Sequence, residues 1–203
     1  MAKKKSRKFR VYELPKLKIK AEKLVLSCDP GSANFGIALV GLTRESKIKV
    51  YANAVLMTPL NDLVRFNHRS EEFLNEIDSW LAYSPGAIIA ERFQSRGLQG
   101  PTIELVSSML GLMRGRYQLP MKLTIASTWK NRFQQRFDID LKDIYAEADV
   151  QPHQIDAALI GIFGLEEGLQ TILDWDIDDI IDQVSATSLI GHKGEKHPKK
   201  ERV

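Results

Sequence analysis

The sequence has few cysteines and no long apolar run. Cys28 is the only cysteine among 203 residues. One cysteine excludes an internal disulfide and cannot by itself form a zinc site, so we expect Cys28 to be a small buried residue of a strand. No apolar stretch approaches the roughly 20 residues that span a bilayer, and the basic N-terminus lacks the apolar segment of a secretory signal. We therefore expect no membrane association and a location in the cytoplasm or nucleoid.

Net positive charge is confined to the two ends of the chain. Residues 1–20 carry nine Lys or Arg and one Glu, and residues 190–203 carry five Lys or Arg and two Glu, whereas the whole chain has a net charge of only +3. Two basic tails therefore flank a body with a net charge of −8. Such tails are usually solvated, but clusters of Lys and Arg also attract phosphate. The charge alone leaves nucleic acid binding and simple solubility equally open.

Apolar periodicity and turn residues divide the chain into three parts. We expect a basic flexible arm at 1–22, one α/β domain at 23–170, and an extension with a basic tail at 171–203. Residues 172–189 are acidic and aliphatic, and they form either a short extra helix or a flap that faces a partner.

The predicted domain begins with three strands in an antiparallel meander, the third with one solvated face, and continues with alternating helices and strands. This order predicts a mixed five-stranded sheet with helices on both faces. The expected strands lie at about 23–29, 35–42, 47–56, 87–91 and 121–127, and the expected helices at about 61–83, 101–118, 128–137, 141–148 and 152–169.

Three acidic residues stand where this topology brings distant segments together. Asp29 ends the first strand, Glu91 ends the fourth, and Asp156 lies near the start of the last long helix. If the first and fourth strands are neighbours, all three carboxylates meet at one edge of the sheet. Each acid alone also has a simpler explanation, because Asp-Pro-Gly at 29–31 is a turn signal and an acid at a strand end is most often exposed.

The combination favours a metal site. Neighbouring carboxylates repel one another unless cations neutralise them, and Mg²⁺ is a hard cation that prefers oxygen ligands. Two such ions about 4 Å apart activate a water and stabilise the leaving oxygen in phosphodiester cleavage. His153, three residues before Asp156 on the same helix face, is either a ligand, a base for the attacking water, or a helix-start histidine without a catalytic role.

The ordered set of motifs resembles that of the RuvC-type Holliday junction resolvases, which are RNase H-like nucleases. The resemblance covers about residues 24–168 and rests on LSCDPGSANFGIAL, IIAERF, SSMLGLMRGRY, TIASTWKNRF and HQIDAALIG. It implies an RNase H-like fold, a homodimer, and nicking of four-way DNA junctions with Mg²⁺ or Mn²⁺, two ions per site, that leaves 5′-phosphate and 3′-hydroxyl ends. Bacterial recombination, a phage-infected host and an organelle are the settings that it suggests.

The resemblance also assigns roles to the candidate residues. Asp29 matches the acid that bridges both ions, Glu91 matches the second acid and Asp156 the last, so these three and His153 are the predicted catalytic residues and metal ligands. His153 stands where many relatives have Asp and some have His. In the family an aromatic residue shortly after the second acid wedges into the junction, and here Phe93 is either that wedge or a packed loop aromatic.

A DNA-facing surface is predicted from the basic residues in or beside the motifs, because Lys and Arg around a metal site position phosphate without reading bases. These residues are Arg92, Arg96, Arg114, Arg116, Lys122, Lys130 and Arg132. Small residues of the helix at 101–118, namely Ser107, Ser108, Gly111 and Gly115, form a narrow face that suits helix contact across a two-fold axis.

Two other functions stay open at this point. One is a branched-DNA-binding module of the same fold that has lost turnover, and calorimetry with Mn²⁺ discriminates it from the nuclease. The other is an RNA-directed nuclease of the same superfamily, which competition between an RNA–DNA hybrid and a four-way junction discriminates.

Overall fold

The computed structural model describes residues 14–31, 34–57, 66–92 and 101–189. Its elements, in chain order, are β1 (Lys23–Pro30), β2 (Asn34–Leu42), β3 (Ile48–Met57), α1 (Phe66–Leu81), β4 (Ala87–Arg92), α2 (Pro101–Arg116), β5 (Met121–Ile125), α3 (Ala126–Phe137), α4 (Leu141–Glu147), α5 (Pro152–Leu169), α6 (Ile177–Ala186) and β6 (Ser188–Leu189). None of the helices within these ranges is long and apolar enough to cross a bilayer.

The strands form one mixed sheet in the order β5-β4-β1-β2-β3-β6. The meander of β1, β2 and β3 is antiparallel, and β4 and β5 join it in parallel. These pairings confirm the predicted fold class. The predicted count of five strands was one too low, because β6 pairs with β3 through Asn53 and Ala54.

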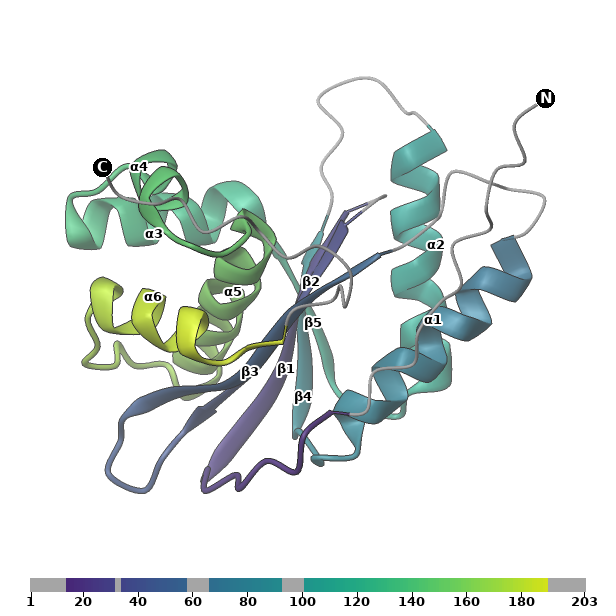
Figure 1. The fold of residues 1–203 in the computed structure, drawn as a ribbon, viewed down its shortest axis with the longest axis horizontal. Coiled ribbons are helices and arrows are strands. Elements are labelled where there is room, and N and C mark those ends of the chain that lie inside the picture. The colour runs from purple at the N-terminus through teal and green to yellow at the C-terminus, as the bar shows by residue number, and fades with distance from the viewer. Residues whose placement is uncertain (1–13, 32–33, 58–65, 93–100, 190–203) are drawn as a thin grey trace, which may run out of the picture.

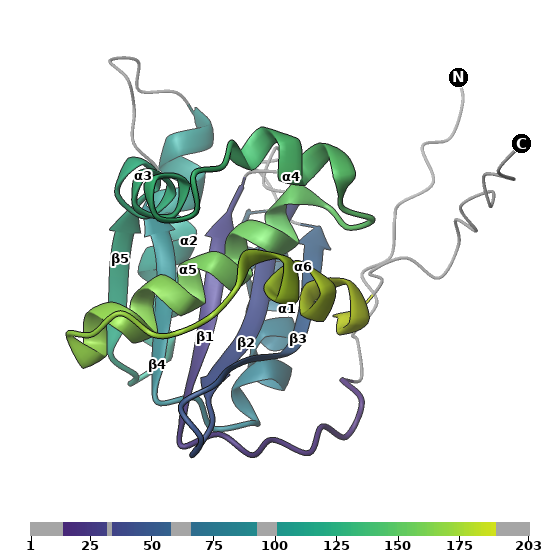
Figure 2. The ribbon, with the colours of Figure 1, turned by 90° about the vertical axis from the view of Figure 1, so that its left-hand side faces the viewer.

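Helices cover both faces of the sheet, as predicted. Figure 1 shows α1 and α2 on one side and α3 to α6 on the other, and Figure 2 views the second side face-on. The two layers enclose separate apolar cores. The third strand does not have the predicted solvated face, because Tyr51 and Asn53 are buried as well as Val50 and Ala52.

Helix α5 is the central element of the second layer. Its 13 residues from Gln154 to Glu166 are all buried, because the sheet lies beneath the helix and α3 and α6 pack beside it. Gly161 permits the close approach: a Cβ there would lie 2.7 Å from the hydroxyl of Ser27 in β1. A helix forms here because Pro152 suits the first helical position, and the run from Ala157 to Leu165 has only apolar residues and glycine to bury against the sheet.

The residues before the first predicted strand and after the last predicted helix also pack on the domain. Residues 14–21 follow an extended path in which Leu14, Leu17 and Ile19 are half-buried against the core under α1 and α2. The hydroxyl of Tyr83 donates a hydrogen bond to the carbonyl of Pro15 at 2.6 Å. At the other end, residues 177–186 form the extra helix that was one of the two alternatives for the acidic extension.

Candidate active site

Asp29 and Glu91 lie at the same end of neighbouring strands. Strands β1 and β4 are parallel and in register, with Cys28 opposite Ala90, so the next residue of each strand is an acid at the carboxyl edge of the sheet. Side chains alternate between the two faces of a strand. Asp29 therefore points to the α5 side with Val25 and Ser27, and it is 7% exposed.

The first turn of α5 brings His153 to Asp29. Nδ1 of His153 lies 2.6 Å from Oδ2 of Asp29. This hydrogen bond, more than the opposing effect of burial, raises the pKa of His153 above its usual 6.5. Gly36 in β2 makes the contact possible, since a Cβ at residue 36 would lie 2.0 Å from the backbone oxygen of His153. The glycine of the second strand thus serves the site by admitting α5.

Asp156 lies one turn further along α5 and has both carboxylate oxygens occupied. Nζ of Lys130, from α3, donates to Oδ2 at 2.7 Å, and the hydroxyl of Tyr145, from α4, donates to Oδ1. Burial raises the pKa of Asp156, and the charge of Lys130 opposes that shift. The acid is 7% exposed.

Glu91 has a different environment from the other two acids. Its Oε2 accepts a hydrogen bond from Nε1 of Trp129 at 2.9 Å, and Trp129 itself is fully buried in α3. Burial, followed by the charge of Asp29, raises the pKa of Glu91 to about 7. Asp29 and Asp156 each raise the pKa of Glu91, which places all three acids within electrostatic reach of one another.

The donor set has the chemistry of a divalent-cation site. The three carboxylates, from β1, β4 and α5, supply the hard oxygen ligands that Mg²⁺ and Mn²⁺ prefer, and the imidazole of His153 adds a nitrogen donor. In the residues that the structure describes, however, no group of three or more His, Cys, Asp or Glu side chains stands close enough to hold a metal ion. Each acid instead accepts a hydrogen bond from the protein, and Lys130 offsets part of the negative charge. The expectation that only metal ions could make these acids tolerable neighbours was therefore too strict.

The basic residues predicted to face DNA fall into different places. Lys130 contacts Asp156, and Arg92 is exposed at the end of β4 beside Glu91. Arg114 is exposed on α2, in the layer on the other side of the sheet from α5. Phe93 and Arg96 lie outside the described residues.

The remaining three basic candidates are engaged in ion pairs with carboxylates of the protein. Arg116 joins α2 to α1 through Glu71 at 3.0 Å and Asp78 at 2.6 Å. Lys122 lies 3.6 Å from Glu167, and Arg132 lies 2.7 Å from the same residue. The arginine pairs join one helix to another and the lysine pair joins β5 to α5, so DNA would have to compete with these carboxylates for the basic side chains.

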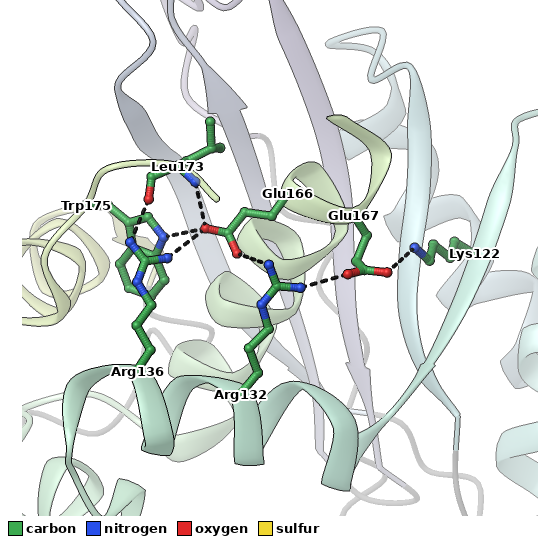
Figure 3. A network of polar contacts seen from close by, with 7 residues as sticks. All are labelled: Lys122, Arg132, Arg136, Glu166, Glu167, Leu173 and Trp175. Atoms are coloured by element: carbon green, nitrogen blue, oxygen red, sulfur yellow. Dashed lines mark hydrogen bonds and ion pairs between the residues drawn. The ribbon is translucent and has the colours of Figure 1, made fainter. Parts of the chain in front are cut away.

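A buried carboxylate that the sequence patterns did not reveal lies at the far end of α5. Figure 3 shows Glu166 between Arg132 and Arg136 of α3, at 3.1 and 2.8 Å. Its Oε1 also accepts hydrogen bonds from the backbone of Leu173 and from the indole of Trp175, both at 3.0 Å. The network fixes α3 on α5, and α3 carries Trp129 and Lys130 to the acids.

A second buried network joins the start of α5 to the C-terminal extension. Nε2 of Gln154, the residue after His153, donates to Oδ1 of Asn53 at 2.6 Å and to the hydroxyl of Ser188 at 2.7 Å. Nδ2 of Asn53 donates to the backbone of Val184 and to the hydroxyl of Thr187. The C-terminal extension thus supports the first turn of α5, which carries His153. We call this network the C-terminal brace.

Sequence reasoning selected the three acids, His153 and Lys130, but it did not identify Trp129 and Tyr145 as hydrogen-bond donors to Glu91 and Asp156. Trp129 had a usable signal, because it directly precedes the candidate Lys130 in a segment already assigned to the site. Gln154 lies in the quoted motif HQIDAALIG, but its bond to Asn53 had no signal. Tyr145 and Asn53 had none either, because their contacts depend on how separate elements pack.

Comparison with solved structures gives the fold a name. No family model and no curated protein matched the sequence. RuvC of Thermus thermophilus in complex with a Holliday junction substrate matches with a TM-score of 0.56 at 17% identity, over 74% of this chain and 98% of that one. A second T. thermophilus RuvC structure matches with a TM-score of 0.55 at 14% identity, over the same shares of the two chains.

The yeast mitochondrial Holliday junction resolvase matches less well, with a TM-score of 0.46 at 16% identity, over 83% of this chain and 78% of that one. The two T. thermophilus structures establish that this chain has the RNase H-like fold of RuvC. The predicted fold is thereby confirmed, with the added strand β6 at the edge.

Proposed function

We propose that this protein is a metal-dependent endonuclease that resolves four-way DNA junctions. The observation that carries the proposal is the convergence of Asp29, Glu91 and Asp156, from β1, β4 and α5, within electrostatic reach of one another at one edge of a sheet with the fold of RuvC. The first T. thermophilus structure was solved with a Holliday junction substrate, which makes branched DNA the substrate to test first.

The acids are the residues that would hold the cations. A bound pair of Mg²⁺ or Mn²⁺ ions would supply an activated water and positive charge at the scissile phosphate. Asp29 would be the acid shared between the ions, and the effect of its charge on the pKa of both Glu91 and Asp156 supports that role. Glu91 must lose its proton before it can bind an ion, because only the carboxylate is a ligand.

The other side chains orient the acids and move the proton. Asp29 accepts from Nδ1–H of His153, so in the neutral ring Nε2 would be the nitrogen that binds an ion or takes a proton from the attacking water. Lys130 contacts Asp156 and carries positive charge to the acids. A lysine in this position neutralises a phosphate oxygen without reading the base.

Symmetric cleavage requires two copies of the site. We propose a homodimer that uses the exposed face of α2, where Ser107, Ser108, Gly111 and Gly115 accompany Leu112, a large apolar residue that is 39% exposed. Two active sites related by a two-fold axis suit a four-way junction, because resolution needs two cuts.

The test is cleavage of a synthetic four-way junction with Mg²⁺. Wild-type protein should nick two opposite strands, and Asp29→Asn should bind the junction with wild-type affinity without cutting it. Asp174→Asn, which alters an exposed acid far along the chain, is the matched control and should cut normally. Equal cutting by Asp29→Asn would refute the site.

The same assay addresses the two alternatives. Wild-type protein that binds the junction and does not cut it with either metal ion would be the non-catalytic module. Faster cleavage of an RNA–DNA hybrid than of the junction would identify the RNA-directed nuclease.

A further inference from the structure

Tyr145 is the second donor to Asp156, and it is not part of any motif that led to the site. It lies on α4, whose residues contribute no other contact to the acids among those that the structure describes. Its hydroxyl donates to Oδ1 of Asp156, while Lys130 occupies Oδ2. Each oxygen of this carboxylate therefore has one protein donor. The donor to Oδ1 is neutral, and the donor to Oδ2 is a cation.

The position of Tyr145 is set by the fold. Helix α4 begins at Leu141, which is buried, and Asp140 caps it by accepting a hydrogen bond from the backbone of Lys142 at 2.9 Å. Asp138, in the left-handed conformation with φ 51°, turns the chain from α3 into α4. The ring of Tyr145 is half-buried and packs against the core around α5. The hydroxyl is thus held at Asp156 by packed structure.

The two donors differ in what a divalent cation would do to them. The ammonium group of Lys130 carries a full positive charge, so a divalent cation that binds Asp156 repels it. The flexible side chain of Lys130 allows the ammonium group to move away. The tyrosine hydroxyl is neutral and uses one lone pair of Oδ1, which leaves the other oxygen and the remaining lone pair for the ion. Tyr145 can therefore stay in place while the ion binds.

Hydrogen-bond donors to a ligating carboxylate normally set its orientation, and their removal weakens metal affinity about 10- to 100-fold. We propose that Tyr145 is a positioning residue, which holds Asp156 in the orientation that binds a divalent cation. The proposal rests on the proposed function, because it assigns Asp156 as a ligand.

The experiment is Mn²⁺ binding to the full chain by isothermal titration calorimetry, without DNA. Tyr145→Phe keeps the ring and removes only the hydroxyl. The matched control is Tyr117→Phe, which removes a buried hydrogen bond of similar kind, from the hydroxyl of Tyr117 to the backbone of Leu74 at 2.8 Å, on the other side of the sheet. Tyr145→Met, which also lacks a donor, is a second variant with a different shape.

We expect both Tyr145 variants to bind Mn²⁺ about 10-fold or more weakly than wild type, and Tyr117→Phe to bind as wild type does. In the junction assay, Tyr145→Phe should need about 10-fold more Mn²⁺ for half-maximal cleavage and recover near wild-type rates at saturating metal. A residue that only stabilised the fold would lower the rate without shifting the metal dependence.

The failure of this inference is distinguishable from the failure of the proposed function. If wild type binds Mn²⁺ and cuts, while Tyr145→Phe binds it equally well or more tightly, the role of Tyr145 is refuted and the nuclease stands. If wild type binds no Mn²⁺, the metal-dependent nuclease is refuted and the role of Tyr145 with it.

Discussion

Nδ1 of His153 lies 2.6 Å from Oδ2 of Asp29, although the two residues are 124 positions apart in the chain. The hydrogen bond joins the first turn of α5 to the end of β1. An aspartate at position 153 would repel Asp29, whereas the histidine attracts it. The pair therefore stabilises the position of the first turn of α5 against the end of β1 before any cation binds.

His153→Gln should remove a stabilisation that depends on pH. The pKa of His153 is raised in the folded state by its hydrogen bond to Asp29, so protonation of the ring favours folding. The gain is complete below the ordinary pKa of about 6.5 and is lost as the pH rises through the folded value. Urea unfolding with a chelator present should show a larger difference between wild type and variant at pH 5.5 than at pH 8.5. A constant difference would contradict the pairing.

Gly36→Ala should disrupt the site from the second strand. Its Cβ would lie 2.0 Å from the backbone oxygen of His153, so the start of α5 must shift. We expect a loss of about 1–3 kcal/mol in the free energy of unfolding together with a loss of junction cleavage. Gly168→Ala is the control, because nothing lies within 4 Å of its Cβ, and it should leave stability equal or slightly higher.

Glu76→Gln should flatten the pH dependence of stability near neutrality. Glu76 is 4% exposed, its Oε1 has no hydrogen-bond partner, and burial raises its pKa from 4.5 to about 7. The folded state therefore holds a proton that the unfolded state releases, so wild type should lose about 1–3 kcal/mol as the pH rises from 4.5 through 7. Chemical unfolding at several pH values measures this loss. Glu104→Gln, at an exposed acid of α2, should keep the wild-type profile.

Asn53→Ala should loosen the C-terminal brace. It removes the acceptor for Gln154 and the donor to Val184 and Thr187, all in a buried setting. We expect a loss of about 2–3 kcal/mol and faster hydrogen exchange across α6. Ser188→Ala removes one bond and should cost about 1 kcal/mol. If the two variants unfold with equal free energies, the network does not act as a brace.

Leu112→Glu should convert the proposed dimer to a monomer. Leu112 lies on the exposed face of α2 and is 39% exposed, so a charge there would be buried without a partner in a two-fold interface. Sedimentation velocity should show wild type as a dimer and the variant as a monomer. Leu123→Glu alters a residue of β5 that is 42% exposed and should remain dimeric. A monomeric wild type would refute the interface.

The sequence alone predicted the order of the elements and the four residues at the centre of the site. Strands and helices have their own periodicities, so β1 to β5 and α2 to α5 could be located from local patterns. Parallel neighbouring strands end at one edge of a sheet. The sequence argument therefore brought the acids at positions 29 and 91 together on the condition that the first and fourth strands are neighbours, and the structure meets that condition.

The tertiary structure decided which partners those residues have. The two-residue strand β6 carries no periodic signal of its own and exists because β3 offers an unpaired edge. Arg116 and Arg132, which the sequence predicts to face DNA, form ion pairs with acids on other helices that no local pattern indicates. Trp129 and Tyr145 become donors to Glu91 and Asp156 only through the packing of α3 and α4 on α5. Such contacts depend on where distant segments meet, and a local pattern in the sequence does not contain that information.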